Sequence, residues 1–252
     1  MRKQSLKLLF MLLIATITIL ACSSNSDDSD GGTGTTITLH EAFSDFDVDE
    51  TDIYLDGSTV VIETTGNPNH TTPYWGSGHA LYVAPTVATN LTPSLIPGYD
   101  GSATLRVPSS PTLAGSTTAT SLGAIGISIS GAAIFNDQEG NGDLSSAVVS
   151  LDYSGGHIGP AEYHYHLEPK AWSDDDENLI GIISDGFFIY GRKCNSTSTY
   201  PTDLDTSGGH TSTTQHTMTA EYHYHVINNL YTTTGRYLLF AGPYTGTPNA
   251  IN

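Results

Sequence analysis

The sequence predicts an all-β fold, an antiparallel sandwich or barrel-like domain with an internal duplication and few short helices. From Ile37 onward the chain is rich in Thr, Ser, Gly and Tyr, and poor in the Lys, Arg, Leu and Glu that build amphipathic helices. Short β-branched or aromatic stretches recur between Gly, Pro, Asn and Asp residues. In addition, one histidine-rich motif occurs twice, which indicates two related units.

The expected strands follow one another along the chain and are separated by turn residues. They are Thr59–Gly66, Ala80–Pro85, Ser102–Pro108, Ala124–Phe135, Leu179–Tyr190 and Arg236–Tyr244. Their lengths and compositions are those of strands in a sandwich or barrel. The single helix that the sequence predicts is short, Asp143–Leu151, with Asp143 as its N-cap.

Residues 1–21 are predicted to be a signal peptide. Three positive charges within the first seven residues precede an apolar run that is too short for a stable membrane span. The run ends in ILAC, Ile19–Cys22, which is similar to a bacterial lipobox, so we expect Cys22 to be lipidated. An ordinary signal peptide followed by an incidental cysteine is the alternative.

Residues 22–36 are expected to form a flexible acidic and Gly-Thr tether behind the lipid anchor. Ser23 and the acidic stretch Ser24–Asp30 favour an outer-membrane lipoprotein, and the acidic stretch further suggests surface exposure. The outer membrane, reached through the lipid anchor, is therefore the expected partner. Residues 37–252 would then form the folded β domain, with duplicated units at about 120–178 and 179–252.

The charge balance excludes one class of partner. The chain has 8 Lys and Arg against 26 Asp and Glu, a net charge of −18. The predicted signal peptide holds three of the basic residues and no acidic residue, so the mature chain carries a net charge near −21. Such a charge repels nucleic acid and attracts cations. Cys22 and Cys194 are the two cysteines of the sequence, so no disulfide is expected inside the mature domain.

The duplication centres on two motifs. LDxSGGH occurs at Leu151–His157 and Leu204–His210, and AEYHYH occurs at Ala161–His166 and Ala220–His225. The apolar stretches before them, IGISISGAAIF and IGIISDGFFIY, also match, with Ile134 and Phe135 corresponding to Ile189 and Tyr190. Two such units can pack about a pseudo-twofold axis. We therefore expect equivalent motifs to meet in one composite site.

The motifs have the spacing of metal ligands. Side chains alternate along a strand, so the two histidines of each H-x-H share one face and the tyrosines share the other. These pairs are the leading metal ligands, and each SGGH turn adds a further histidine; the six candidates are His164, His166, His223, His225, His157 and His210. Imidazole groups suit Zn²⁺ or Cu²⁺.

The ligand arrangement has open alternatives. Asp152 and Asp205 are expected to accept hydrogen bonds that orient the imidazoles. Two sites of three histidines each, or one site of four, both fit the spacing. The competing interpretation is metal-free, with the histidines satisfied inside a tyrosine-rich core.

Other motifs are weaker. The oxygen-rich segment Asn136–Asp143 suggests a Ca²⁺ loop, although an ordinary acidic turn is favoured because EF-hand spacing is missing. Asp185, in an Asp-Gly turn, is a candidate to face the site. Cys194 is a lone thiol without a motif around it, and His216 is expected to be a loop residue. No serine has the sequence context of a catalytic nucleophile.

These residues together resemble the YHYH domain family, a group of mostly exported bacterial proteins. The resemblance depends on segments spread over most of the predicted domain: TGNPNH (Thr65–His70), ISGAAIFN (Ile129–Asn136), LDYSGGHIGPAEYHYHLEP (Leu151–Pro169), IGIISDGFFIYG (Ile180–Gly191) and the second histidine motif. It implies that His70 is a further site residue. Phe188 stands where the family usually has proline, a change that a turn tolerates. The resemblance implies no particular activity.

Three functions are consistent with these observations. The first is an exported lipoprotein whose metal is structural or is bound for acquisition. The second is a metal-dependent hydrolase, in which Glu162 or Glu221 would act as general base beside a metal-activated water. The third is a metal-free adhesion or glycan-binding module, whose small-molecule or glycan ligand the sequence does not identify. Four ligands in a closed shell would favour a structural metal, whereas three ligands and an open position would favour catalysis.

Overall fold

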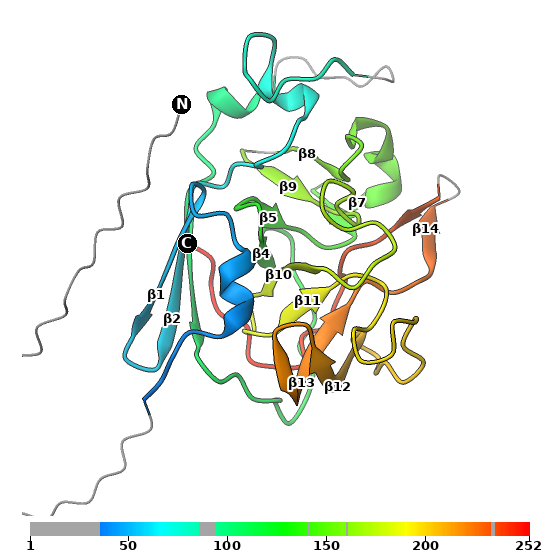
Figure 1. The fold of residues 1–252 in the computed structure, drawn as a ribbon. Coiled ribbons are helices and arrows are strands. Elements are labelled where there is room, and N and C mark those ends of the chain that lie inside the picture. Colours follow the sequence, from blue (N-terminus) through cyan, green and yellow to red (C-terminus); the bar gives the residue numbers. More distant parts are fainter. Residues whose placement is uncertain (1–35, 86–93, 141, 160, 233–234) are drawn as a thin grey trace, which may run out of the picture. The chain divides into compact units, whose positions relative to one another are not determined.

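The computed structural model describes residues 36–252 apart from 86–93, 141, 160 and 233–234 (Figure 1). The predicted signal peptide, Cys22 and the tether as far as residue 35 lie outside the described residues. Ile37–Asn252 forms a compact unit that contains every element described below. None of the helices in the described ranges is long and apolar enough to cross a membrane.

The prediction of an all-β fold is confirmed. An eight-stranded sheet holds both histidine motifs. Its strands, in spatial order, are β12 (Gly209–Thr214), β13 (Thr217–His225), β11 (Phe188–Tyr190), β10 (Leu179–Ile183), β4 (Gly126–Ser128), β5 (Ala133–Ile134), β9 (Tyr163–Tyr165) and β8 (Gly156–Ile158). The central strands are buried, as their continuous β-branched sequences require.

The strand order makes the internal duplication visible. From either edge inward, the sheet presents an SGGH strand, a YHYH strand, the second strand of an apolar hairpin and then its first strand. The first unit contributes β4, β5, β8 and β9, and the second contributes β10, β11, β12 and β13. Strands β4 and β10 pair antiparallel at the centre, with Gly181 opposite Ser128. The pseudo-twofold relation therefore passes between these two strands.

The sheet is not wholly antiparallel. Strand β9 runs parallel to β5, and β13 runs parallel to β11, in equivalent registers that place Ile134 opposite Tyr165 and Ile189 opposite Tyr224. The reason is the connection in each unit. After β5 or β11 the chain crosses a loop and forms the SGGH strand at the edge of the sheet. It then turns back to form the YHYH strand, which is antiparallel to the SGGH strand and therefore parallel to β5 or β11.

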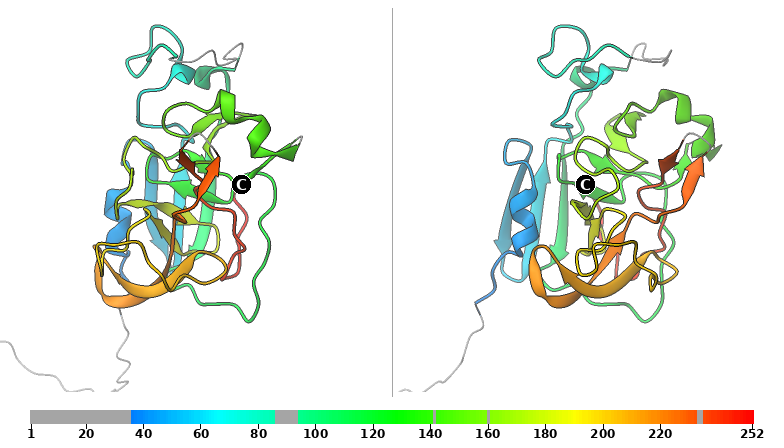
Figure 2. Two further views of the ribbon diagram at one scale, coloured as in Figure 1. Left: turned by 90° about the vertical axis from the view of Figure 1, so that its right-hand side faces the viewer. Right: turned by 45° about the vertical axis from the view of Figure 1, so that its right-hand side comes forward.

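A smaller antiparallel sheet packs on the middle of the large one. It consists of β1 (Thr51–Asp56), β2 (Thr59–Thr64) and β3 (Ala103–Pro108). Val60, Ile62 and Leu105 share an apolar core with Leu179 and Ile182 of the large sheet. The two sheets therefore face each other as in a sandwich, and Figure 2 shows β1 and β2 standing alongside the larger sheet. A second core, rich in Tyr, Ile and Phe, lies around Ile134, Tyr165 and Tyr224.

The remaining elements are short. The short strands β6 (Gln138–Glu139) and β7 (Gly142–Asp143) form one hairpin, and β14 (Leu230–Thr232) and β15 (Arg236–Tyr237) form another. The helices of the described ranges are single 3₁₀ turns: η1 (Glu41–Asp45), η2 (Pro73–Trp75), η3 (Ile96–Gly98), η4 (Leu144–Ser146) and η5 (Val148–Ser150). Asp143 caps η4, since its carboxylate accepts a hydrogen bond from the Ser145 N–H.

Several local predictions were wrong. Ala124–Phe135 and Leu179–Tyr190 are each a hairpin of two strands, and Arg236–Tyr244 is a strand only over Arg236–Tyr237. Ala80–Pro85 is not a strand, because its N-terminal part is folded in turns and only Tyr82 forms a bridge, with Thr72. The expected helix over Asp143–Leu151 is instead the pair η4 and η5. The serine hydroxyls of this segment compete with helical hydrogen bonding, since Ser146 and Ser150 donate to nearby backbone carbonyls. Its two valines would also lose side-chain freedom in a helix.

Candidate metal centres

The structure gathers the six motif histidines into two groups. The SGGH and YHYH strands pair so that His157 lies opposite His164, and His210 lies opposite His223. The next histidine in each YHYH motif completes the group. One group holds His157, His164 and His166 with Glu139, and the other holds His210, His223 and His225 with Cys194. In each, the four candidate ligand atoms lie within 4.8 Å of one another, so each group could hold a metal ion.

The expected single composite site is not formed. Strands β9 and β13 lie near opposite edges of the eight-stranded sheet, with β5, β4, β10 and β11 between them. Neighbouring strands are about 4.8 Å apart, so roughly 24 Å separates the two YHYH strands. The pseudo-twofold axis brings the apolar hairpins together and leaves the histidine motifs far apart.

The Nδ1 atom of every histidine in the first group faces a hydrogen-bond acceptor. His166 Nδ1 lies 2.5 Å from the Asn136 carbonyl oxygen, and His164 Nδ1 lies 3.2 Å from the Glu162 carbonyl oxygen. His157 Nδ1 lies 2.7 Å from the Ser150 hydroxyl, which already donates to the Ala147 carbonyl. The Ser150 oxygen must therefore accept, so all three Nδ1 atoms carry the proton.

The second group repeats this arrangement. His225 Nδ1 lies 2.7 Å from the Gly191 carbonyl oxygen, and His223 Nδ1 lies 3.0 Å from the Glu221 carbonyl oxygen. His210 Nδ1 lies 2.9 Å from the Asp203 carboxylate. A carbonyl or a carboxylate can only accept. The Nδ1 atoms of these three histidines are therefore donors as well.

The remaining ring nitrogens point at each other. A neutral imidazole that is protonated on Nδ1 has a bare lone pair on Nε2. His164 Nε2 lies 2.9 Å from His166 Nε2, and His223 Nε2 lies 3.1 Å from His225 Nε2. Two lone pairs at this distance repel each other unless a cation lies between them. That cation is either a proton or a metal ion.

Burial disfavours the proton. It lowers the pKa of His164 well below its ordinary value, and His157 and His166 nearby lower it further. In the second group, burial lowers the pKa of His223 to about 4, with a further contribution from His225. It also lowers the pKa of His225 to about 4. Near neutral pH these imidazoles are uncharged, so their lone pairs are available as metal ligands.

Each group also contains an anionic or ionisable fourth donor. Glu139 Oε1 lies 3.0 Å from His157 Nε2 and 3.1 Å from His166 Nε2. Glu139 Oε1 and His157 Nε2 are buried, and within the described residues neither atom makes a hydrogen bond despite these close contacts. Unpartnered buried polar atoms call for an explanation, and an ion held by these four donors is one that fits their chemistry.

Cys194 occupies the corresponding place in the second group. Its Sγ lies 3.4 Å from His210 Nε2 and contacts the hydroxyls of Ser196 and Ser212. Burial by itself raises the pKa of the thiol, but hydrogen bonds from Ser196 and Ser212 and the nearby His210 outweigh it, so the pKa is lowered. A lowered pKa favours the thiolate, which is the form that binds metal.

These distances fit a tetrahedral ion. With Zn–N bonds of 2.0–2.1 Å, two imidazole nitrogens on one Zn²⁺ lie about 3.3 Å apart, and a thiolate lies roughly 3.6 Å from an imidazole nitrogen. The observed separations of 2.9 to 3.4 Å are slightly shorter and need only small side-chain adjustments. The donor sets His₃Glu and His₃Cys are both ones that Zn²⁺ accepts.

Sequence reasoning missed Glu139 and Cys194 as candidate ligands. The interval of 55 residues between Ile134 and Ile189 also separates Glu139 from Cys194. Extending the repeat from the apolar strand into the loop would have aligned them. Because they differ in residue type, the match is invisible to a search for repeated letters.

Asp152 and Asp205 do not have the role predicted for them. Each carboxylate accepts hydrogen bonds from backbone N–H groups of its own SGG turn and from a tyrosine hydroxyl. Tyr163 donates to Asp152 at 2.6 Å, and Tyr222 donates to Asp205 at 2.8 Å. The carboxylates therefore fix the turns and the tyrosine face of the strands, while backbone carbonyls, Ser150 and Asp203 orient the imidazoles.

His70 and Asp185 also lie on the tyrosine side. His70 Nε2 is 2.7 Å from the Tyr165 hydroxyl, and Asp185 accepts a hydrogen bond of 2.6 Å from Tyr224. Tyrosines and histidines of a YHYH strand point to opposite faces. His70 and Asp185 thus support the core behind the two groups and do not join them.

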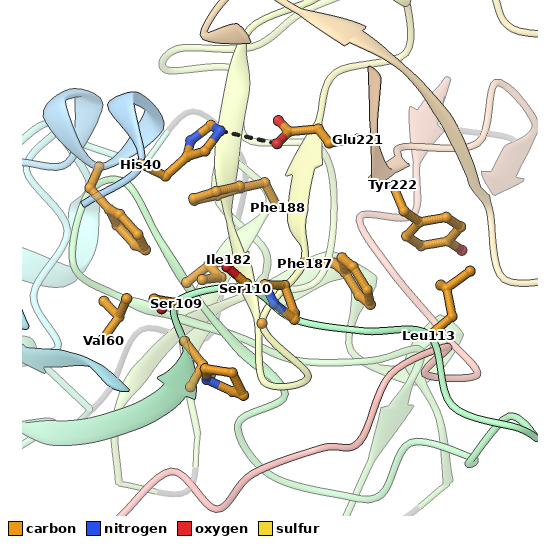
Figure 3. A pocket seen from close by; sticks show the side chains of 15 residues that line it. His40, Val60, Ser109, Ser110, Leu113, Ile182, Phe187, Phe188, Glu221 and Tyr222 are labelled. Carbon is orange, nitrogen blue, oxygen red and sulfur yellow. Dashed lines mark ion pairs between the residues drawn. The ribbon is translucent and has the colours of Figure 1, made fainter. Parts of the chain in front are cut away.

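The two candidate bases have separate surroundings. The Glu162 carbonyl orients His164, and burial raises the pKa of its carboxyl group. The Glu221 carboxylate lies 3.1 Å from His40 Nε2, at the wall of a largely apolar cavity of about 370 Å³ that Phe187 and Phe188 also line (Figure 3). Neither carboxylate is among the four ligating groups of a cluster.

The segment Asn136–Asp143 does not gather its oxygen atoms. The Asn136 side chain contacts Thr120 and Ser121, Glu139 faces the histidines, and Asp143 caps η4 and accepts from Tyr231. The described residues of this segment therefore form a hairpin with divergent oxygens, as expected of an ordinary turn.

Comparison with known families agrees with the motif. Searches of curated proteins and of solved structures gave no match. The family model described as YHYH protein matches residues 104–203. This range includes the first histidine group, Glu139 and Cys194, and it ends before the second group's histidines. Over this segment the chain is therefore similar to the YHYH proteins.

Proposed function

We propose that this protein is an exported lipoprotein whose β domain binds two transition-metal ions, one in each half, with Zn²⁺ and Cu²⁺ as the candidates. The observation that carries the proposal is the convergence of Nε2 lone pairs in two separate groups, with every Nδ1 atom held by an acceptor. Bound metal would be structural or would be carried for acquisition.

The lone pairs argue for metal over a hydrogen-bonded core. A metal-free core would orient neighbouring imidazoles so that an N–H of one meets a lone pair of the next. Here the backbone carbonyls of Asn136 and Gly191 accept hydrogen bonds from Nδ1 of His166 and His225. The Nε2 lone pair of each histidine therefore faces the Nε2 lone pair of its neighbour. Each pair is therefore arranged for a shared cation, at the cost of an unfavourable contact when the cation is missing.

Four donors per group favour a closed coordination shell. Activation of water by zinc requires an open position beside three protein ligands. The fourth donors, Glu139 and Cys194, fill that position, which favours binding over hydrolysis. Three of the four motif tyrosines, Tyr163, Tyr165 and Tyr224, are buried in the core, which disfavours a glycan-binding surface built from the motifs.

The location follows from the N-terminal sequence. A signal peptide over residues 1–21, lipidation of Cys22 and the acidic tether support an outer-membrane lipoprotein with its metal sites outside the cytoplasm. A net charge near −21 for the mature chain concentrates cations around it. Export and metal capture are thus compatible.

The test is the metal content of Ile37–Asn252, purified without a His-tag and incubated with Zn²⁺ or Cu²⁺. We expect two ions per chain, one in His164→Ala/His166→Ala, one in His223→Ala/His225→Ala, and none in the quadruple variant. His79→Ala, an exposed histidine outside both groups, is the matched control and should keep two. Absence of bound metal in the folded parent would refute the proposal, and circular dichroism would establish that each variant is folded.

A further inference from the structure

The fourth donors differ in chemical character. Glu139 offers a hard carboxylate oxygen, whereas Cys194 offers a soft sulfur. Thiolate ligands select zinc and hold it more firmly than carboxylates do, because the zinc–sulfur bond is more covalent. Each group otherwise offers three histidine nitrogens, so this difference bears directly on how long each would keep an ion.

The two donors also differ in how they are held. The Glu139 side chain is 18% exposed and belongs to the two-residue strand β6, whose partner β7 is exposed. Cys194 is 1% exposed. Its N–H donates to the Thr199 carbonyl, and its own carbonyl accepts from Thr197 and Ser198. Nearby, the buried Arg192–Glu168 pair (2.9 Å) anchors the same segment.

The Nδ1 acceptors of the histidines also favour firmer metal binding in the group that contains Cys194. His210 donates to the carboxylate of Asp203, whereas the equivalent His157 donates to the neutral hydroxyl of Ser150. A carboxylate behind an imidazole raises its basicity and strengthens the metal bond. Three independent features therefore favour the group that contains Cys194.

We infer that the two sites have different roles: the Cys194 group retains its ion, and the Glu139 group is the exchange site, where the carboxylate can swing away and let an ion enter or leave. This inference rests on the proposed metal binding. It assigns capture or delivery of a divalent ion to one edge of the sheet, and permanent stabilisation of the fold to the other edge.

The experiment follows metal release from Ile37–Asn252 loaded with Co²⁺, after addition of excess chelator. We expect two phases of one ion each, with the slow phase at least about tenfold slower than the fast one. Thiolate-to-cobalt charge-transfer absorption should disappear only in the slow phase, since sulfur is a ligand in that group alone. A second measurement with Zn²⁺ and a chromophoric chelator should give the same two phases.

Exchanging the fourth donors gives reciprocal variants. Glu139→Cys should slow the fast phase, and Cys194→Glu should accelerate the slow phase and abolish the charge-transfer band. Glu139→Gln is the conservative variant and should accelerate the fast phase alone.

A single release phase for two bound ions, or loss of the sulfur band in the fast phase, would overturn the inference and leave the proposed metal binding intact. Failure of the parent protein to bind cobalt or zinc would refute both.

Discussion

The two halves of the eight-stranded sheet share a backbone and differ in a few chemical groups. Both use a backbone carbonyl two residues after the equivalent Ile134 and Ile189, that of Asn136 or Gly191, to orient the last histidine of YHYH. Both use the carbonyl of the glutamate that precedes YHYH to orient its first histidine. These acceptors belong to the backbone, so they survive when the side chains diverge. The geometry of a duplicated site can therefore persist while its donors change.

The differences are concentrated around the face of the sheet that carries the two histidine groups. Glu139 corresponds to Cys194, and Ser150 corresponds to Asp203. On the opposite face, Tyr165 meets the neutral Ser130 and His70, whereas Tyr224 meets the carboxylate of Asp185. The second half thus has the softer metal donor and more negative charge around its tyrosine and histidine.

The largest expected effect is acid destabilisation of the metal-free domain. Burial holds the pKa of both His223 and His225 at about 4, and unfolding returns each to an ordinary value near 6.5. Between those values the unfolded chain binds more protons than the folded chain. The free energy of unfolding therefore falls as the pH drops through this window, by about 3 kcal/mol for each of these histidines.

Urea unfolding in the presence of a chelator, repeated across this pH range, measures the effect. His223→Gln/His225→Gln should remove the contribution of the second half, and His164→Gln/His166→Gln should remove that of the first. Comparing the two variants shows which half is more sensitive to acid. A parent protein with the same stability at about pH 7 and about pH 4.5 would contradict the prediction.

The next effect distinguishes the two SGG turns. Gly155 and Gly208 both have positive φ, +85° and +82°. Alanine in this region costs about 1–2 kcal/mol at either position. A Cβ on Gly155 would also lie 2.8 Å from the Leu167 carbonyl oxygen, whereas one on Gly208 would meet the half-exposed Ile227 side chain at 3.2 Å.

We therefore expect Gly155→Ala to destabilise the domain more than Gly208→Ala, by roughly 1–3 kcal/mol of added overpacking. Chemical denaturation of the two variants beside the parent measures the difference. Gly123→Ala, at a positive φ of +101° with open space around its Cβ position, reports the backbone cost alone. If the two alanine variants lose equal free energy of unfolding, the chain around Gly155 must adjust to the added Cβ as easily as the chain around Gly208, which would contradict the prediction.

The smallest expected effect concerns the side chains that orient His157 and His210. Ser150→Ala should weaken one ion, and Asp203→Ala the other, each by about tenfold or somewhat more, because the imidazole loses its Nδ1 acceptor. Competition titration with a chromophoric chelator measures both affinities in one experiment. The undisturbed site in each variant is the internal control, and equal weakening of both ions would contradict the assignment.

Much of this molecule was predictable where the information is local. Alternation along a strand places His164 with His166 and His223 with His225, and each pair does share a face in the structure. Thr59–Gly66 and Ser102–Pro108 contain β2 and β3, because β-branched runs between turn residues have few other solutions. The N-cap role of Asp143 was likewise readable, although the helix behind it was not.

Other features depended on contacts between distant residues. The roles of Asp152 and Asp205 were misjudged because carboxylates beside histidines suggest imidazole partners, whereas the SGG turns and tyrosine hydroxyls are closer competitors. His70 was associated with the histidine site through the family resemblance. The structure places it behind Tyr165, on the face that the strand's alternation assigns to tyrosine.

The sequence alone determined the all-β class, the duplicated motif and which histidines share a strand face, since each follows from composition or from the two-residue period of a strand. The tertiary structure decided that the sites are two and not one, because the central pairing of β4 with β10 puts the YHYH strands near opposite edges. It also placed Glu139 and Cys194 beside the histidines; these residues follow β5 and β11, the strands next to the YHYH strands. Strand order and loop course are set by packing across the whole domain, and no local pattern encodes them.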